Sequence, residues 1–145
     1  MYPKKIEAVF LQLHFKIYMK DSNNKKKILV VDDDDNLNTV LVDKLNLSGF
    51  LAIGATDGED GLKKALENHP DLILLDVLMP KMDGLGMLKK LREDSWGKKS
   101  KVIMLTVLEQ SDYIAKAVEN DVYGYFVKTN FSLDELVKKI EEALK

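Results

Sequence analysis

The stretch ILVVDDDDNL (Ile28–Leu37) places four apolar residues directly before four consecutive aspartates, Asp32 to Asp35. The apolar run is typical of a buried strand. Carboxylates that lie a few ångströms apart raise one another's pKa, so this arrangement is costly unless something neutralises it. The stretch therefore predicts a strand that ends at a site holding a cation, a lysine or both.

Short apolar runs with this character recur along the rest of the chain. They are KILVVD, FLAIGA, DLILLD, KVIMLT and YGYFVK, which end at Asp32, Ala55, Asp76, Thr106 and Lys128. Segments with helical spacing and one polar face separate them, at about 35–48, 58–68, 84–94, 109–119 and 132–144. Asp34 or Asp35 can cap the first of these helices, Asp83 the third, and Ser132 to Glu135 form a capping box for the last.

This alternation predicts an α/β fold for residues 26–145. Five strands that alternate with five helices indicate a parallel sheet covered by helices on both faces, because parallel neighbours need crossover connections. The natural candidate is a flavodoxin-like, doubly wound five-stranded sheet in the order 2-1-3-4-5.

Residues 1–25 differ from the rest and form an N-terminal extension. Apolar residues alternate with more polar ones from Leu11 to Met19, which is strand periodicity and predicts an extra edge strand. Alternatively, translation begins at Met19 and the preceding residues belong to a mis-assigned start. The apolar run is too short for a membrane-spanning helix and lacks the cleavage site of a signal peptide.

Composition excludes several functions. The chain has 145 residues, enough for one domain with a real core, and a formal net charge of -2. This charge provides no basic face for nucleic acid, so direct nucleic acid binding is not expected. The absence of cysteine excludes disulfides and thiolate metal sites. We expect a cytoplasmic protein with no membrane association.

The ends of the expected strands carry the candidate functional residues. In a doubly wound sheet, ligands bind at the carboxyl ends of the strands, beside the point where strand order reverses. The first and third strands flank that point and end in Asp32, Asp33 and Asp76. Carboxylate oxygens with few nitrogens suit a hard cation, and a site that leaves room for water and phosphate oxygens suits Mg²⁺ better than calcium. Asp34 and Asp35 are expected to be helix-cap and solvent-exposed residues instead.

These motifs resemble the receiver domains of two-component response regulators over nearly all of the chain from Lys26. The acidic pair follows ILVV, an aspartate lies in DLILLDVLMPKMDG, a threonine ends VIMLT and a lysine ends GYFVK. Each motif alone is weak, but their order and spacing together are specific. The resemblance implies that Asp76 accepts a phosphoryl group and that Lys128 and Thr106 contact its oxygens.

The resemblance also implies the metal ligands and the switch residues. Mg²⁺ would be bound by Asp33, Asp76 and the backbone carbonyl of Leu78, with Asp32 acting through water. Thr106 and Tyr125 would rearrange on phosphorylation, a population shift driven by the new dianionic group.

The partners implied by the resemblance are a sensor histidine kinase or phosphotransfer protein and a downstream effector protein or domain. A phosphorylation-dependent dimer is a further implied partner. The chain would act as a phosphoacceptor with at most self-phosphorylation and self-dephosphorylation, not as a turnover enzyme.

Two departures from the family pattern and two alternative functions stay open at this point. Thr129 stands where the family usually has proline after a cis bond, so we expect a trans or strained bond that could aim Lys128 differently. Val107 stands where a small residue is common, and its bulk predicts slower turnover of the phosphoryl group.

One alternative is a haloacid dehalogenase-like phosphatase, in which Asp32 and Asp34 form the acidic pair. The other is a receiver-like interaction module that works without phosphorylation.

Overall fold

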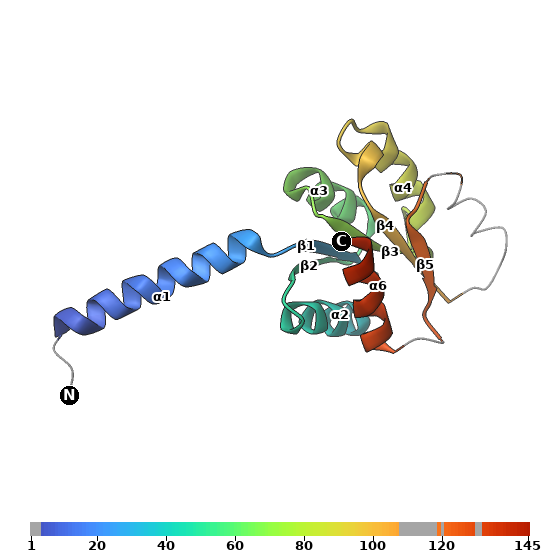
Figure 1. Cartoon of the computed structure of the whole chain (residues 1–145). Coiled ribbons are helices and arrows are strands. Elements are labelled where there is room, and N and C mark those ends of the chain that lie inside the picture. Colours follow the sequence, from blue (N-terminus) through green and yellow to red (C-terminus); the bar gives the residue numbers. More distant parts are fainter. Residues whose placement is uncertain (1–3, 108–118, 120, 130–131) are drawn as a thin grey trace.

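A five-stranded parallel sheet forms the centre of the computed structural model, which describes residues 4–107, 119, 121–129 and 132–145 (Figure 1). The strand order is β2-β1-β3-β4-β5, and every neighbouring pair is parallel. The strands are β1 (Lys27–Val31), β2 (Leu51–Ala55), β3 (Leu72–Asp76), β4 (Val102–Thr106) and β5 (Gly124–Val127). The predicted doubly wound order is therefore confirmed, and each strand lies within the run predicted for it.

Helices cover both faces of this sheet, α2 and α6 on one side and α3 and α4 on the other (Figure 1). Their bounds are α2 (Asp35–Leu47), α3 (Gly58–Asn68), α4 (Gly84–Glu93) and α6 (Leu133–Ala143), and a short 3-10 turn, η1 (Gly97–Lys99), follows α4. These bounds agree with four of the five predicted helices. The fifth, over 109–119, falls almost wholly outside the described residues.

The helix starts are set by local side chains, as the sequence predicts. The Asp34 carboxylate accepts hydrogen bonds from the backbone N–H groups of Asn36 and Leu37. Asp83 caps α4 in the same way, and Ser132 and Glu135 form the complete capping box of α6. Such caps satisfy N–H groups that have no partner inside the helix. Asp57, which caps α3, was not predicted.

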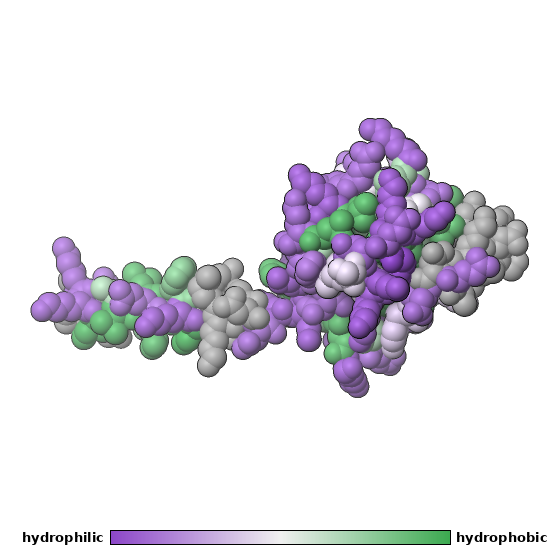
Figure 2. All heavy atoms as spheres, turned by 90° about the horizontal axis from the view of Figure 1, so that it is seen from above, coloured by the Kyte–Doolittle hydropathy of each residue, from purple (hydrophilic) through white to green (hydrophobic). Residues whose placement is uncertain are grey.

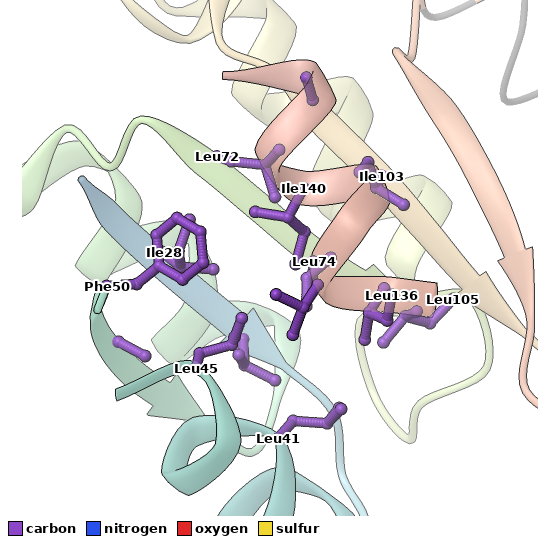
Figure 3. Close-up of a cluster of buried hydrophobic side chains, with 14 residues drawn as sticks. Ile28, Leu41, Leu45, Phe50, Leu72, Leu74, Ile103, Leu105, Leu136 and Ile140 are labelled. Carbon is purple, nitrogen blue, oxygen red and sulfur yellow. The ribbon is translucent and has the colours of Figure 1, made fainter. Parts of the chain in front are cut away.

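Two hydrophobic clusters, one on each face of the sheet, form the core. Alternate strand residues point to opposite faces, so β1, β2, β3 and β4 each contribute to both clusters. The first cluster joins the strands to α2 and α6 and includes Ile28, Leu41, Leu45, Leu72, Leu74, Ile103, Leu105, Leu136 and Ile140 (Figure 3). The second joins them to α3 and α4 and includes Leu29, Val31, Ala65, Ile73, Leu75, Met79, Met87, Leu88, Leu91 and Met104. All residues of β3 and β4 are buried, as expected for central strands covered on both faces.

The N-terminal segment is a helix, α1 (Lys4–Asn24), that extends away from the sheet (Figure 1). The predicted edge strand is therefore wrong, whereas the alternative of a start at Met19 stays a prediction. A helix satisfies its backbone hydrogen bonds within the segment and needs no neighbouring strand. Apolar side chains along α1 are exposed to solvent, among them Phe10, Leu13 and Phe15 (Figure 2). Among the described residues, no helix combines the length and apolar character needed to cross a membrane.

Candidate functional site

Three carboxylates meet where β1 and β3 end. These strands are parallel neighbours with Val31 opposite Leu75, so the residues that follow, Asp32 and Asp76, reach the same edge of the sheet. Each of Asp32, Asp33 and Asp76 offers one carboxylate oxygen, and the three oxygens lie within 4.8 Å of one another. Asp32 and Asp76 are buried, whereas Asp33 is exposed. The sequence prediction that two sets of carboxylates converge at this edge is thus met by the structure.

Lys128 supplies the positive charge that the aspartate run requires. Its Nζ atom lies 2.6 Å from Oδ2 of Asp32 and 3.3 Å from Oδ1 of Asp76. Its backbone N–H donates to the carbonyl of Thr106 at 2.6 Å, which anchors the end of β5 to the end of β4. No peptide bond between described residues is cis, so the Lys128–Thr129 bond is trans, as expected. The lysine reaches both aspartates without a proline at position 129.

The close packing of these charges shifts two pKa values. Burial raises the pKa of Asp76 from its ordinary 3.8 to about 7, and the charge of Asp32 adds to this effect against the opposing charge of Lys128. For Lys128, burial lowers the pKa, but the carboxylates of Asp32 and Asp76 outweigh burial and raise it. Lys128 therefore stays charged, and in the absence of a metal ion Asp76 binds a proton more readily than an ordinary aspartate.

Asp32 is held through its backbone as well as its side chain. Its N–H donates to the carbonyl of Ala55, and its Oδ1 accepts from the N–H of Asp34 at 3.0 Å. The side-chain amide of Asn38 donates to the carbonyls of Asp32 and Ala55 at 3.1 and 2.8 Å. Sequence reasoning did not single out Asn38. The sequence feature that could have identified Asn38 is its place as a polar residue on the apolar face of α2, three residues before Leu41 and seven before Leu45.

The loop from β3 to α4 lies beside Asp76 and carries Leu78, whose side chain is exposed. Gly84, the first residue of α4, donates its N–H to the carbonyl of Val77 at 2.9 Å. A Cβ atom at Gly84 would overlap the carbonyl oxygen of Asp76, so this position has no room for a side chain. The close approach fixes the start of α4 against the strand end that carries Asp76.

The other predicted site residues surround this centre. Thr106 is buried at the end of β4, and Val107 beside it is half exposed. Tyr125 lies on β5 with its side chain 44% exposed, and its carbonyl accepts a hydrogen bond from Lys139 of α6. The roles assigned to Thr106 and Tyr125 stay predictions.

The donor set fits a divalent magnesium ion. Three carboxylates face one lysine, so the fully ionised site carries two uncompensated negative charges, and it offers only oxygen ligands. Asp33 and Asp76 would be the direct ligands, as the resemblance implies. Asp32 makes the shorter contact with Lys128, at 2.6 Å against 3.3 Å for Asp76, and is fully buried. The cluster includes neither Asp34 nor Asp35, in line with the prediction that they lie outside the metal site.

The phosphatase alternative requires Asp34 to act together with Asp32. In the structure the Asp34 carboxylate instead accepts the N–H groups at the start of α2. That alternative would also leave the buried Asp76 without a function. The geometry therefore opposes it.

Comparisons with known proteins agree with this geometry. The family model described as "Response regulator receiver domain" matches residues 28–141. The "Probable transcriptional regulator ycf27" of Porphyridium aerugineum is 37% identical over 110 residues, 76% of this chain and 44% of the relative. The "Alkaline phosphatase synthesis transcriptional regulatory protein PhoP" of Bacillus subtilis is 38% identical over 107 residues, 74% of this chain and 43% of the relative. The chain thus spans less than half the length of these curated relatives.

Solved structures show the same similarity over the whole domain. The chemotaxis protein CheY4 of Vibrio cholerae superposes with a TM-score of 0.78 at 29% identity, over 83% of this chain and 99% of that protein. A LuxR-family DNA-binding response regulator from Staphylococcus aureus gives a TM-score of 0.75 at 33% identity, over 83% of this chain and 99% of that structure. The family match covers nearly all of the sheet and of the helices packed on it, and every residue of the candidate site, and the chain therefore belongs to the response regulator receiver domain family.

Proposed function

We propose that this receiver domain accepts a phosphoryl group from a histidine kinase, or from a phosphotransfer protein, on the carboxylate of Asp76 in a magnesium-dependent reaction. The observation that carries the proposal is the position of Asp76. Its buried carboxylate lies within 4.8 Å of two other aspartates and 3.3 Å from Lys128, at the end of a central strand. Membership of the receiver family supports the same residue.

The proposed reaction is a direct transfer between two nucleophiles. A carboxylate oxygen of Asp76 attacks the phosphorus of a phosphohistidine, and a P–O bond forms as the P–N bond breaks. The imidazole leaves with the electron pair of the broken bond, and the product is an acyl phosphate on Asp76. Magnesium, when bound, supplies positive charge against the phosphoryl oxygens.

The surrounding residues have separate roles in this proposal. Lys128, already 3.3 Å from Asp76, pairs with a phosphoryl oxygen once the carboxylate is esterified. Thr106 donates its hydroxyl to another oxygen of the group. Tyr125, now exposed, turns inward as Thr106 moves, which changes the surface around β5 and α6.

We propose that this changed surface signals to a downstream effector protein or domain, or to a second phosphorylated copy. The chain would act in the cytoplasm as a phosphoacceptor, with at most self-phosphorylation and self-dephosphorylation. Direct nucleic acid binding is not part of the proposal, since the net charge is -2. The alternative, an interaction module that works without phosphorylation, would leave the carboxylate cluster and its lysine without a chemical role.

The test is the intact-protein mass after incubation with acetyl phosphate, with magnesium or with a chelator, on the parent and on Asp76→Asn. We expect a gain of one phosphoryl group that requires magnesium and is lost in the variant. Asp83→Asn is a matched control, because Asp83 lies in the same loop region but caps α4 through Gly86. No gain in the parent would favour the interaction module.

A further inference from the structure

We propose that Asn38 is a positioning residue for the metal site, which it serves by holding the backbone between Asp32 and Asp33. The inference rests on the proposed magnesium-dependent function, and it assigns a role to a residue outside the proposed metal ligands and phosphoryl acceptor. Asn38 lies on α2, is only 6% exposed and points its amide toward the ends of β1 and β2.

The hydrogen bonds of Asn38 link the main chain at the end of β1 to that at the end of β2 in a small ring of hydrogen-bonded groups. The amide nitrogen donates to the carbonyl of Asp32 at 3.1 Å and to that of Ala55 at 2.8 Å. The Ala55 carbonyl also accepts the N–H of Asp32 at 3.1 Å. The main chain of Asp32 is therefore held at both its N–H and its C=O, through one shared acceptor on β2.

This ring matters for the metal because of the peptide bond it fixes. The Asp32 carbonyl belongs to the same planar peptide group as the N–H of Asp33. A hydrogen bond that holds this oxygen therefore fixes the orientation of the peptide group that precedes the Asp33 side chain. Asp33 is exposed, and its carboxylate needs a fixed backbone to stay near Asp76. Residues that hydrogen-bond to and orient metal-binding residues commonly matter for affinity, and their removal lowers metal affinity by about 10- to 100-fold.

A second observation shows that the fold makes room for this side chain. A Cβ atom at Gly54, the last residue but one of β2, would overlap the Oδ1 atom of Asn38 and would contact Val42 at 3.4 Å. The small residue at position 54 and the amide at position 38 are therefore mutually dependent. An alanine at position 54 would push Asn38 away from the strand ends without changing its chemistry.

The simpler interpretation is that Asn38 only stabilises the packing of α2 on the sheet. Asn46 provides a matched control for that interpretation. It lies two turns later on α2 and bonds β2 in a similar way, with its Oδ1 accepting the N–H of Ala52 at 2.8 Å and its Nδ2 donating to the Ala52 carbonyl at 3.4 Å. Asn46 ties the same helix to the same strand but near the opposite end of the strand from the carboxylates. Loss of packing alone would affect both residues alike.

The experiment measures Mg²⁺ affinity by isothermal titration calorimetry on the full chain, with stability measured by urea unfolding. Asn38→Leu keeps the size of the side chain and removes its donors, and we expect Mg²⁺ affinity to fall by about tenfold. Asn46→Ala should lower stability but leave the affinity within about twofold of the parent, because distant sites act independently. Gly54→Ala should weaken Mg²⁺ binding as Asn38→Leu does, and Asn38→Ala with Gly54→Ala should bind no more weakly than Asn38→Ala alone.

The outcomes separate this inference from the proposed function. If the parent binds Mg²⁺ and Asn38→Leu binds it equally well, the positioning role is overturned and the phosphoacceptor role stands. If Asn46→Ala weakens binding as much as Asn38→Leu, the effect is general packing and the inference also fails. If the parent itself does not bind Mg²⁺, the proposed magnesium-dependent function is wrong, and the inference about Asn38 is wrong as well. Should Asn38→Leu not fold, Asn38→Ala provides the same comparison without the branched side chain.

Discussion

Lys128 forms a buried ion pair with Asp32, with 2.6 Å between Nζ and Oδ2, and the lysine side chain is only 13% exposed. Asp76 lies farther from the same nitrogen, at 3.3 Å. The lysine is thus anchored on the aspartate that is not the proposed acceptor. This arrangement leaves the Asp76 carboxylate the less tightly held of the two, and available to react.

Loss of Lys128 should therefore destabilise the fold as well as the reaction. Lys128→Ala leaves the buried Asp32 and Asp76 carboxylates without a cation, and we expect a loss of about 3 kcal/mol in unfolding free energy without magnesium. Added Mg²⁺ should restore part of this loss. Urea unfolding with chelator and with magnesium checks both statements.

The control for that experiment is Lys44→Ala. Lys44 pairs with Asp134 at 2.9 Å on the surface, where the aspartate side chain is 81% exposed. Solvent-exposed pairs contribute little, so this variant should unfold close to the parent. Equal losses for the two lysine variants would contradict the importance of the buried pair.

The raised pKa of Asp76 predicts a pH dependence of stability in the absence of metal. Its pKa is about 7 in the folded protein and 3.8 ordinarily, so between these values the folded state binds more protons than the unfolded state. Stability from this group is present at low pH and is lost as pH rises through about 7. From about pH 5 to about pH 8, the parent should lose on the order of 2 kcal/mol relative to Asp76→Asn.

Unfolding curves of the parent and Asp76→Asn in chelator, collected across that pH range, test this dependence. Parallel curves would show that Asp76 does not titrate differently in the folded state. With magnesium present, the difference should shrink or reverse, because a bound divalent cation favours the ionised carboxylate.

Thr106 is expected to act on the rate of phosphorylation more than on metal binding. Thr106→Ala removes a buried hydroxyl at the end of β4, the strand that pairs with the strand of Asp76. It should slow phosphorylation by acetyl phosphate by roughly tenfold or more, because the proposed donor to the reacting oxygens is lost. Thr106→Ser keeps the hydroxyl and should recover most of the rate. An alanine variant with the parent's rate would remove Thr106 from the mechanism.

Val107 follows Thr106, and its side chain is half exposed. We expect its bulk to narrow the approach to Asp76. Val107→Ala should therefore shorten the lifetime of the acyl phosphate several-fold by admitting water. The measurement is the decay of the phosphorylated mass with time after the donor is removed. Decay at the parent's rate would remove this explanation.

The helix α1 should contribute little to the folded domain, because it extends away from the sheet and its apolar residues are exposed. A chain that begins at Lys25 should unfold at nearly the same temperature as the full chain and should be phosphorylated equally well. Calorimetry and the mass assay on both chains check this expectation. A large fall in the unfolding temperature would show contacts between α1 and the domain.

Most of the sheet and the position of the carboxylates followed from the sequence because both depend on local patterns. Apolar runs that are buried on both faces are continuous, and residues such as Asp34, Asp83 and Ser132 cap helices through bonds to their near neighbours. Because β1 and β3 are parallel neighbours in the predicted strand order, that order alone places Asp32 and Asp76 together at the carboxyl ends of the strands. Local signals were sufficient for these features.

Features that depend on contacts between distant segments were harder to predict. The bonds from Asn38 to Ala55 require the packing of α2 on β2, which no local pattern reports. The direction of Lys128 was hard to predict because the residue pairs with Asp32, which lies far earlier in the sequence. The apolar residues from Leu11 to Met19 alternate as in a strand, but this segment lies within the helix α1.

The origin of the site in three separate strands has a consequence for folding. Asp32 and Asp76 arrive with β1 and β3, whereas Lys128 arrives only when the edge strand β5 docks. A partly assembled chain without β5 in place would retain the acidic cluster and still attract a divalent cation. It would lack the lysine that is proposed to hold the transferred group, so the proposed phosphorylation, unlike metal binding, requires that β5 has docked.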